Sequence, residues 1–374
     1  MSIDRSWKSP YDTAITKLIE SRFLSRGSWL GRLTSVDDFI DTGKVLIVAE
    51  VGINHNGSVR LAKEMIDIAV SAGVDVVKFQ TANVEEVVTK KASLAPYQRG
   101  KQSPGTTQMD MLKQYHLRID DFEELYNYCS NRILFASTAF DLNSLKVIES
   151  LNPAFIKVPS GEITNFPFLS AVGAIRRKTI VSTGMSSMEE IHDALSVIQE
   201  GGTSLNMITL LHCTSAYPAP IDDLNLRAIQ TLSTTFNCQV GYSDHSPGML
   251  APIIAVSLGA KVIEKHFTTS RNLEGPDHAA SLEPQELVEM VRLIRQTETA
   301  LGYEKKVVTP SELPNLKIAR RSIVASKRII KGEKLSESNI TTKRPADGLS
   351  PMLWRTIIGK FATKEYEKDD LIEE

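Results

Sequence analysis

Apolar residues along the middle of this 374-residue chain follow two alternating patterns. Short β-branched runs alternate with amphipathic segments of helical length from about residue 45 to about residue 300. The runs predict strands over residues 45–51, 74–81, 133–139, 155–160, 179–184, 208–213, 239–245 and 261–268. Segments between them, such as 59–73, 187–202 and 287–302, are typical of helices with one apolar face.

This alternation predicts an α/β fold. Strands that are almost continuously apolar are typical of a parallel sheet, since the crossover helices cover both of its faces. Eight successive strands are the number that closes a (β/α)8 TIM barrel, which is the architecture we expect. An open, doubly wound sheet is the alternative.

The pattern changes on both sides of the expected barrel, which we place at residues 44–303. Residues 1–43 form an N-terminal extension, with an amphipathic helix expected over residues 14–24. Residues 304–315 hold two prolines and are expected to be a linker. Residues 316–374 contain short strand patterns and turn signals, which predict a small, mostly β domain.

The composition of the chain indicates which binding partners and which cellular compartment to expect. The formal net charge of −2 gives no reason to expect nucleic acid or an anionic membrane surface. We see no apolar run long enough to span a bilayer and no secretory signal, so we expect a cytoplasmic protein. The three cysteines have no metal-ligand spacing and are expected to be reduced packing residues.

Polar residues stand at the end of every expected strand. A single buried lysine or histidine is more often structural, but removing so many polar groups from water costs several kcal/mol, roughly, unless something binds there. Barrel enzymes place their active sites at these strand ends. The residues include Glu50, Lys78 and Gln80, Ser137 and Thr138, Lys157, Ser160 and Glu162, Ser182, His212 and Ser215, Ser243 and His245, and Glu264 and His266.

Two of these groups indicate a small anion and a metal ion. Lys78 and Lys157, with nearby hydroxyls, suit a ligand that carries phosphate and carboxylate. His245 and His266 end adjacent strands and could offer two imidazole nitrogens to one divalent metal, with paired structural histidines as the alternative. The hydroxyls are those of Thr138, Ser160, Ser182 and Ser243, and the groups suited to sugar hydroxyls are Gln80, Tyr217 and Asp277.

The sequence at the strand ends closely resembles the sialic acid synthase family, which includes the N-acetylneuraminate, legionaminate and pseudaminate synthases. The C-terminal region resembles the antifreeze-like (SAF, β-clip) capping domain of that family. The matching blocks are AEVGINHNGS (49–58), VVKFQT (76–81), IKVPSGEITN (156–165), STGM (182–185), LLHCTSAYP (210–218), GYSDHSPG (241–248) and EKHFTTSRNLEGPDHAASLEP (264–284).

The resemblance implies a role for each matching residue. It implies that Arg344 reaches the sugar acetamido group bound by the partner subunit of a domain-swapped homodimer. His245 and His266 match ligands of a divalent metal, with Mn²⁺ preferred and Mg²⁺ or Co²⁺ as alternatives. Residues matching the phosphoenolpyruvate site are Lys78, Thr138, Lys157, Ser160, Ser182 and Ser243, and those matching sugar contacts are Glu50, Gln80, Tyr217 and Asp277, to which we add Glu162 and Ser215.

The implied reaction condenses phosphoenolpyruvate with a 2-acetamido sugar and water, releasing phosphate by C–O cleavage. The sugar is N-acetylmannosamine or 2,4-diacetamido-2,4,6-trideoxymannose, so the product is N-acetylneuraminate or legionaminate. The two lysines would hold phosphoenolpyruvate, the metal would polarise the aldehyde, and Glu50 would manage a proton. The block GPDHAASLEP favours these two branches over pseudaminate synthase.

Three positions depart from some bacterial members of the family. Ser215 stands where they have Asn, Ala139 where they have Pro, and Thr106 appears in place of an Asn near the sugar. These departures bear on the identity of the sugar. Another phosphoenolpyruvate-dependent 3-deoxy-aldulosonate synthase, and a non-catalytic sugar or phosphate sensor with the same fold, are the rival functions.

Overall fold

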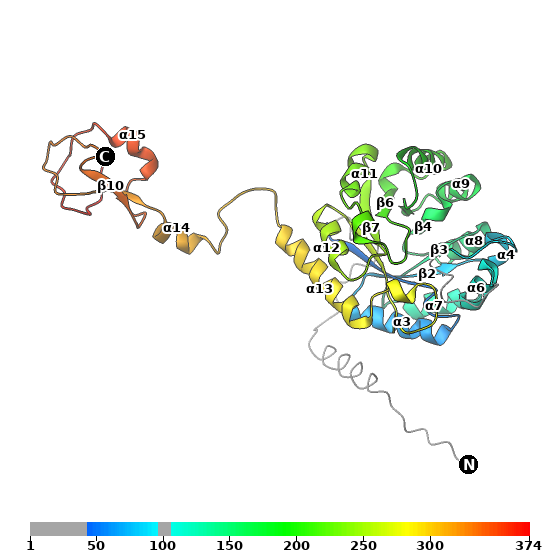
Figure 1. Cartoon of the computed structure of the whole chain (residues 1–374). Helices are drawn as coiled ribbons and strands as arrows, with labels where there is room; N and C mark the ends of the chain where they lie inside the picture. Colours follow the sequence, from blue (N-terminus) through cyan, green and yellow to red (C-terminus); the bar gives the residue numbers. More distant parts are fainter. Residues whose placement is uncertain (1–42, 96–105) are drawn as a thin grey trace, which may run out of the picture. The chain divides into compact units, whose positions relative to one another are not determined.

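The computed structural model describes residues 43–95 and 106–374 (Figure 1). The chain divides into two compact units, with the boundary between Gly302 and Tyr303. The helix expected over residues 14–24, like nearly all of the predicted extension, lies outside the described residues. No helix within the described residues is long and apolar enough to cross a membrane.

The first unit is a closed barrel of eight parallel strands in sequence order, which confirms the predicted (β/α)8 architecture and rules out the open sheet. Each strand begins close to its predicted start. The strands are β1 (Leu46–Gly52), β2 (Val76–Thr81), β3 (Leu134–Ala139), β4 (Ile156–Val158), β5 (Thr179–Ser182), β6 (Ile208–Cys213), β7 (Gln239–Asp244) and β8 (Val262–His266).

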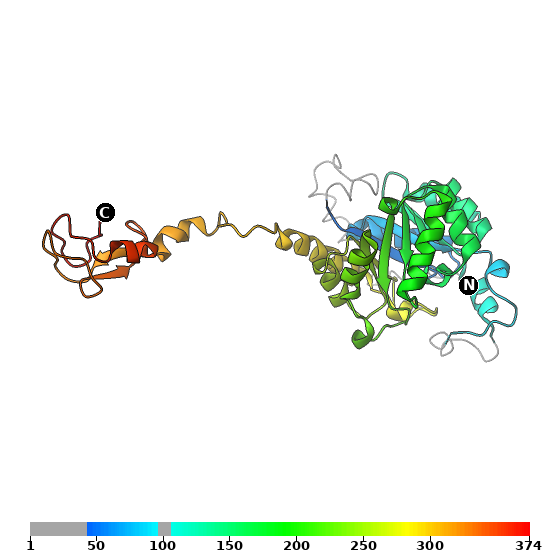
Figure 2. The ribbon, with the colours of Figure 1, turned by 90° about the horizontal axis from the view of Figure 1, so that it is seen from above.

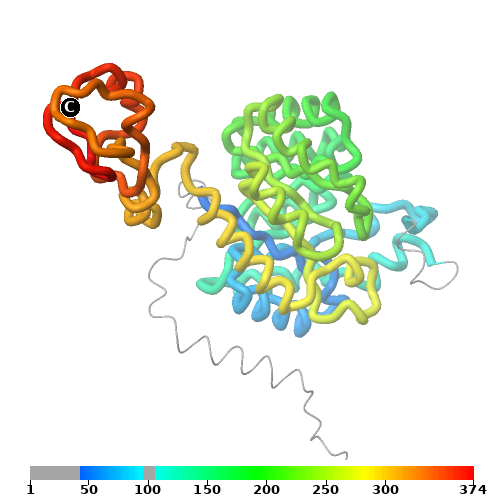
Figure 3. Tube along the Cα trace, turned by 60° about the vertical axis from the view of Figure 1, so that its left-hand side comes forward, coloured from blue at the N-terminus to red at the C-terminus, as the bar shows by residue number. Residues whose placement is uncertain are grey.

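Helices surround the strands on the outside (Figures 1 and 2). The last of them, α13, runs beside the first, α3, and so closes the outer ring (Figure 3). The helices of this unit are α3 (Val59–Ala72), α4 (Val84–Val87), α6 (Gln108–Tyr115), α7 (Asp121–Cys129), α8 (Leu142–Ser150), α9 (Phe166–Ile175), α10 (Met188–Gly201), α11 (Ala228–Phe236), α12 (Leu250–Ser257) and α13 (Pro284–Leu301). Short 3-10 helices are η1 (Ser160–Glu162), η2 (Leu205–Met207), η3 (Ile221–Asp223) and η4 (His278–Ala280).

Local sequence signals set the ends of these helices, as α10 shows. The Ser187 hydroxyl accepts a hydrogen bond from the Glu190 backbone N–H, and the Glu190 carboxylate accepts one from the Ser187 N–H. This reciprocal capping box satisfies two N–H groups that the first turn leaves unpaired. Gly202 ends the helix in the left-handed conformation, at φ 117°, where a side chain is unfavourable.

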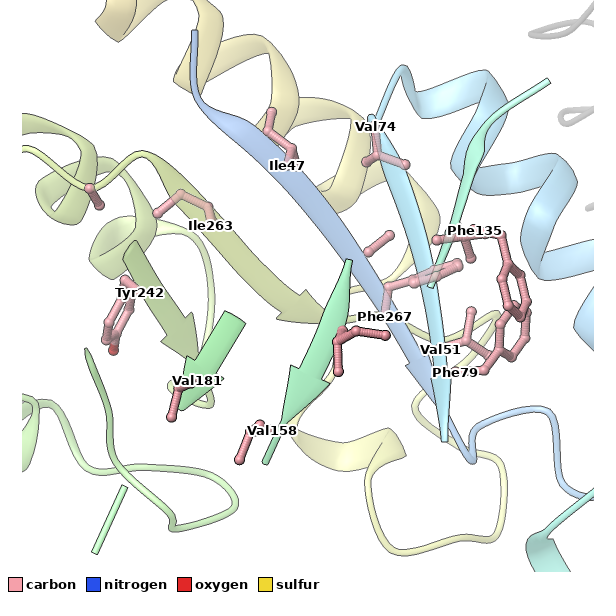
Figure 4. Packing of buried hydrophobic residues seen from close by; sticks show 14 of the residues in the cluster. Ile47, Val51, Val74, Phe79, Phe135, Val158, Val181, Tyr242, Ile263 and Phe267 are labelled. Atoms are coloured by element: carbon pink, nitrogen blue, oxygen red, sulfur yellow. The ribbon is translucent and has the colours of Figure 1, made fainter. Parts of the chain in front are cut away.

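The alternation of side chains along the strands divides the core into two parts. Outward-facing residues, including Ile47, Phe79 and Phe135, pack against the helices (Figure 4). Inward-facing residues, including Leu46 and Val48, fill the interior of the barrel at the N-terminal ends of the strands. Because the same face continues along each strand, the next inward residue of β1 after Val48 is Glu50. The apolar layers therefore end where the polar residues begin.

The second unit has its own small core and a two-stranded antiparallel sheet, which confirms the predicted small, mostly β domain. Its two-stranded antiparallel sheet pairs Ser322 with Lys343 and Ala325 with Ile340. Its elements are α14 (Leu313–Ala319), β9 (Ser322–Ala325), β10 (Ile340–Lys343), η5 (Pro351–Leu353) and α15 (Trp354–Ile357). Its largest fully buried side chain is Tyr366.

His55, in the loop after β1, is a buried histidine outside the predicted site. Its side chain is fully buried, and its Nδ1 accepts a hydrogen bond from the Gly57 N–H at 3.2 Å. Its buried Nε2 has no hydrogen-bond partner within residues 43–95 and 106–374. Burial, followed by the repulsion of His116 and His278, lowers the pKa of His55 to about 3. Folding therefore requires the neutral imidazole.

We expect the barrel to lose stability as the pH falls from 7 to 5. In the unfolded chain His55 gains a proton near its ordinary pKa of about 6.5, whereas in the folded chain it does so only near pH 3, so the unfolded state binds more protons between these values. This difference should lower the free energy of unfolding by about 2 kcal/mol at pH 5. Urea unfolding followed by circular dichroism at both pH values measures it.

His55→Asn should reduce this pH dependence, because the amide oxygen can still accept the Gly57 hydrogen bond and does not titrate. His192→Asn is the control, since His192 lies exposed on α10. An unchanged pH dependence in His55→Asn would show that the folded protein binds the proton at His55 near its ordinary pKa.

Candidate active site

A cavity of about 510 Å³ opens at the C-terminal ends of the strands. The fold brings nearly all of the predicted site residues to this one place. Those that line the cavity are Glu50, Lys78, Gln80, Thr138, Lys157, Ser160, Ser182, Ser215, Tyr217, Ser243, His245, His266 and Asp277.

Two lysines and two glutamates form a buried charged cluster on the cavity floor. The Lys78 ammonium lies 2.6 Å from a Glu50 carboxylate oxygen and 3.6 Å from Glu264. The Lys157 ammonium lies 3.4 Å from the other Glu264 oxygen. All four side chains are almost completely buried. Glu264 therefore acts as a shared counter-ion between the two lysines.

The role of Glu264 was missed in the sequence. Its place at the end of β8, two residues before His266, was visible, and alternation puts both side chains on the inner face. Burial alone would raise the pKa of Glu264, but Lys157 and Lys78 outweigh it and hold the pKa at about 2. The Ser243 hydroxyl donates a hydrogen bond to Glu264 at 3.0 Å. The carboxylate is thus charged at neutral pH.

The pKa of Glu50 is shifted in the opposite direction from that of Glu264, although Glu50 also contacts Lys78. Burial raises its pKa to about 7, because the attraction of Lys78 only partly offsets desolvation and Glu264 adds repulsion. Gln80 donates a hydrogen bond to Glu50 at 3.4 Å. A carboxyl group that titrates near neutral pH can both take and give a proton, which suits general acid–base chemistry.

Hydroxyl groups accompany each lysine. Lys78 donates to the Thr138 hydroxyl at 2.9 Å, and Lys157 donates to the Ser182 hydroxyl at 2.7 Å. The Gly184 N–H donates to the Ser160 hydroxyl at 3.0 Å. Ammonium, hydroxyl and backbone N–H groups that converge in this way supply the donors that phosphate and carboxylate oxygens need.

Gly184 makes room for this convergence. A Cβ at this position would lie 2.3 Å from the Ser215 hydroxyl and 2.8 Å from both the Cys213 sulfur and the Ser160 hydroxyl. Any side chain would therefore displace the polar groups. Cys213 is buried, as expected for a packing residue, but it also lines the cavity, 3.2 Å from Ser160, which the sequence did not indicate.

The two histidines lie side by side in the same cavity, with ring centroids 5.6 Å apart, and His266 is level with Glu50 in the strand register. His245 Nδ1 donates to the Thr214 carbonyl at 2.9 Å, which leaves the lone pair on Nε2. Burial lowers the pKa of both imidazoles, and for His266 the neighbouring His245 and Lys78 lower it further. Both rings are therefore neutral, which is the form that binds metal ions.

The donor set fits a divalent metal with an open coordination sphere. Among the described residues, no group of three or more His, Cys, Asp or Glu side chains is arranged to hold a metal. The buried Nδ1 of His266 has no hydrogen-bond partner in the part of the chain that the structure describes. Two neutral imidazoles that line the cavity would leave the remaining coordination positions for water and substrate oxygens.

Two residues of the predicted substrate site, one in each unit, are not among the residues that line the cavity. Glu162 belongs to η1, where it accepts a hydrogen bond from the Asn165 side chain at 2.5 Å, and it is not among the residues that line the cavity. Asn165 in turn caps the first turn of α9. Arg344 follows β10 directly in the second unit and is exposed there.

Lys78→Met and Lys157→Met should each reduce kcat/KM for the small anionic substrate at least roughly tenfold. Each removes a charged hydrogen-bond donor, worth about 1.5–3 kcal/mol to a bound anion. Steady-state kinetics with varied anion concentration measure the loss. Lys146→Met, on the outer helix α8, is the matched control. Near-normal kinetics in either barrel variant would mean that the anion binds elsewhere.

Comparisons with known proteins match this chain over most of the described residues. The NeuB family model matches residues 65–306, and the SAF domain model matches residues 320–374. The chain is similar to N,N'-diacetyllegionaminic acid synthase of Campylobacter jejuni, with 46% identity over 332 residues, covering 88% of this chain and 99% of that protein. It is 35% identical to N-acetylneuraminate-9-phosphate synthase of Homo sapiens, covering 88% of this chain and 91% of that one.

Among solved structures, the chain is similar to N-acetylneuraminic acid synthetase from Leptospira borgpetersenii in complex with citrate. The TM-score is 0.64 and the identity 33%, over 73% of this chain and 90% of that one. Sequence and fold therefore point to the same group of proteins.

Proposed function

The chain belongs to the NeuB family of sialic acid synthases, and from this premise we propose that it condenses phosphoenolpyruvate with a 2-acetamido sugar to give a nonulosonic acid and phosphate. The observation that carries the proposal is the pairing of Lys78 and Lys157 with hydroxyl groups in the cavity that two neutral histidines also line. A non-catalytic sensor would need the anion donors but neither the buried proton carrier nor the imidazole pair.

Phosphoenolpyruvate would bind on the cavity floor. Lys157, with the hydroxyls of Ser160 and Ser182, offers donors on one side, and Lys78 with Thr138 offers them on the other. Glu264 faces both ammonium groups, and its negative charge favours their charged form before the substrate arrives. Preformed donors reduce the reorganisation that the reaction requires.

We propose that His245 and His266 hold a divalent metal ion, Mn²⁺ by preference. When bound, such an ion supplies Lewis-acid polarisation of the sugar carbonyl. The chain itself orients the imidazoles: the Thr214 carbonyl fixes the His245 tautomer, and the Tyr217 ring lies 4.1 Å from the His245 ring, centroid to centroid. Tyr217 would thereby help to exclude water from this side.

Glu50 is the candidate proton carrier. The new alcohol must gain a proton after carbon–carbon bond formation, and the water that adds to the oxocarbenium centre must lose one. With a pKa raised to about 7 by burial, Glu50 can give one proton and recover another at neutral pH. Its contact with Lys78 places it next to the proposed phosphoenolpyruvate site.

For the sugar, we propose 2,4-diacetamido-2,4,6-trideoxymannose, with legionaminate as the product. Apart from its polar floor, the cavity has an apolar wall that suits acetamido and deoxy-sugar methyl groups better than extra hydroxyls. The wall consists of Ile53, Val87, Val88, Ala95, Met111 and Leu112. The Campylobacter jejuni relative, named for the same diacetylated product, supports this choice.

We propose further that the enzyme works in the cytoplasm as a homodimer whose capping domains cover the partners' barrels. Exposed large apolar side chains in or next to the loops that follow the strands support the proposal that another domain covers this end of the barrel. Phe166, Met185, Ile221 and Leu250 are each more than half exposed in the single chain. Solvent-exposed apolar residues that gather near one site are typical of a surface that another protein covers.

The decisive experiment is a product assay. The enzyme is incubated with Mn²⁺, phosphoenolpyruvate and, in separate reactions, each acetamido sugar, and the products are identified by mass spectrometry. A diacetylated nonulosonic acid formed with the trideoxy sugar alone supports the full proposal. A product only from N-acetylmannosamine would reassign the enzyme as an N-acetylneuraminate synthase. Absence of a condensation product from the whole panel would refute the proposed reaction.

A further inference from the structure

A fully buried ion pair lies on the outer face of the barrel, directly behind the two histidines. Asp244 ends β7 and Lys265 is the last residue but one of β8, and the two stand side by side in the strand register. Neither side chain is exposed to solvent, and the ammonium lies 2.5 Å from a carboxylate oxygen. Because side chains alternate, the neighbours His245 and His266 point the other way, into the cavity.

Every polar atom of this pair has a partner within the protein. One Asp244 oxygen accepts hydrogen bonds from the Tyr242 hydroxyl at 3.0 Å, the Ser246 N–H at 2.9 Å and the Ser246 hydroxyl at 2.7 Å. The other oxygen accepts from Lys265, which also donates to the Ser246 carbonyl. The residues on both sides of His245 are therefore tied to the residue that precedes His266.

We propose that Asp244 and Lys265 are positioning residues that fix the separation and direction of the two imidazoles for the metal ion. The inference rests on the proposed metal site. The ion pair links β7 to β8 at the level of the histidines, and the turn at Ser246 cannot move without breaking several hydrogen bonds. His245 is held from a third direction by the Thr214 carbonyl.

Stability alone is a poor explanation for this pair. Burying two charges carries a large desolvation cost, and apolar residues of similar volume often replace such a pair without loss of stability. What an ion pair with this many hydrogen bonds provides is one defined geometry. Residues behind metal ligands that orient them typically affect metal affinity by 10–100-fold.

The test is Mn²⁺ binding by the full-length protein without substrate. Binding is followed by the electron paramagnetic resonance signal of free Mn²⁺ during titration. The main variant is Asp244→Asn with Lys265→Met, which removes both charges together, keeps the volumes similar and preserves an acceptor for Tyr242. We expect its Kd for Mn²⁺ to rise at least roughly tenfold, while circular dichroism shows a folded barrel.

A matched control removes a second ion pair at the opposite end of the barrel. Arg295 of α13 lies 2.6 Å from Asp75, which precedes β2, and the pair is mostly buried. Asp75→Asn with Arg295→Met should leave the Kd for Mn²⁺ within about twofold of the wild type. Tyr242→Phe is a milder variant that removes one hydrogen bond to Asp244 and keeps the ring in the core, and it should weaken Mn²⁺ binding a few-fold.

The outcomes separate the proposals. Unchanged Mn²⁺ affinity in both the Asp244/Lys265 and Tyr242 variants overturns the positioning role, as does equal weakening in the Asp75/Arg295 control. A wild-type protein that binds no Mn²⁺ overturns the metal site and the inference with it. A wild-type protein that binds Mn²⁺ but forms no product in the sugar panel refutes the proposed reaction and leaves the positioning result standing.

Discussion

Removal of divalent metal should abolish turnover, and added Mn²⁺ should restore it. Without a cation beside His245 and His266, the sugar carbonyl has no Lewis acid, and this contribution amounts to several kcal/mol, roughly two or more orders of magnitude in rate. Phosphate release is measured after dialysis against a chelator and again after addition of Mn²⁺, Co²⁺ or Mg²⁺. We expect Mn²⁺ to give the highest rate.

A histidine control separates this loss from general damage. His212 is another histidine of the barrel, but its Nε2 hydrogen-bonds to the Leu224 carbonyl, and it does not line the active-site cavity. His212→Ala should still be reactivated by Mn²⁺, whereas His245→Ala should not respond. Full activity in protein shown by mass spectrometry to be free of metal would refute the requirement.

The barrel could be predicted because its signal repeats along the sequence. Each strand is a short apolar run, each is followed by an amphipathic helix, and an error in one run would not change the count of the others. The polar strand ends were equally visible, since every parallel strand of a barrel presents its C-terminal end to the same cavity. The pattern alone therefore located Lys78, Lys157, His245 and His266.

The charges of the individual groups could not be predicted in the same way. Glu50 and Glu264 are both strand-end glutamates in contact with Lys78, yet their pKa values are about 7 and about 2. The difference arises because Lys157 also faces Glu264, a contact between strands that are 107 residues apart in the sequence. The register of the strands and the length of each side chain determine which charged groups meet, and therefore each pKa. A local sequence pattern gives neither the register nor these contacts.

The side-chain positions of single residues in and near the loops were the hardest to predict from the sequence. Glu162 stands directly after the strand-end residues Ser160 and Gly161, yet a one-turn 3-10 helix directs its carboxylate to Asn165. The sequence predicts a packing role for Cys213, but this residue also lines the cavity, where the absence of a side chain at Gly184 leaves room for its sulfur. Short turns change side-chain direction within one or two residues, which periodicity cannot resolve.

The capping domain leads to the second large expected effect. Arg344 follows β10 in a unit that packs around its own core, and its guanidinium is exposed there. The barrel cavity is open, whereas an oxocarbenium intermediate must be protected from bulk water. A domain of this size with an exposed guanidinium suits a lid, because a planar fork of donors can bind an amide carbonyl of the sugar.

We expect Arg344 to act on the barrel of the partner subunit. Arg344→Ala alone should lose at least roughly tenfold in kcat/KM, the scale of a charged hydrogen bond. Lys157→Met alone should be inactivated through the anion site. Co-expression of the two variants with different affinity tags allows mixed dimers to be purified. Each mixed dimer joins one intact barrel to one intact cap on the other chain.

If the cap works across the dimer, each mixed dimer contains one site in which Lys157 and Arg344 are both intact, so it should regain about half of the wild-type dimer's activity. If the cap works within its own chain, both sites are damaged and mixing restores nothing. Mixed dimers of Lys157→Met with Lys78→Met are the control, because neither arrangement gives them an intact barrel. Full activity in a monomeric wild-type protein would refute the exchange directly, since a monomer has no partner to supply Arg344.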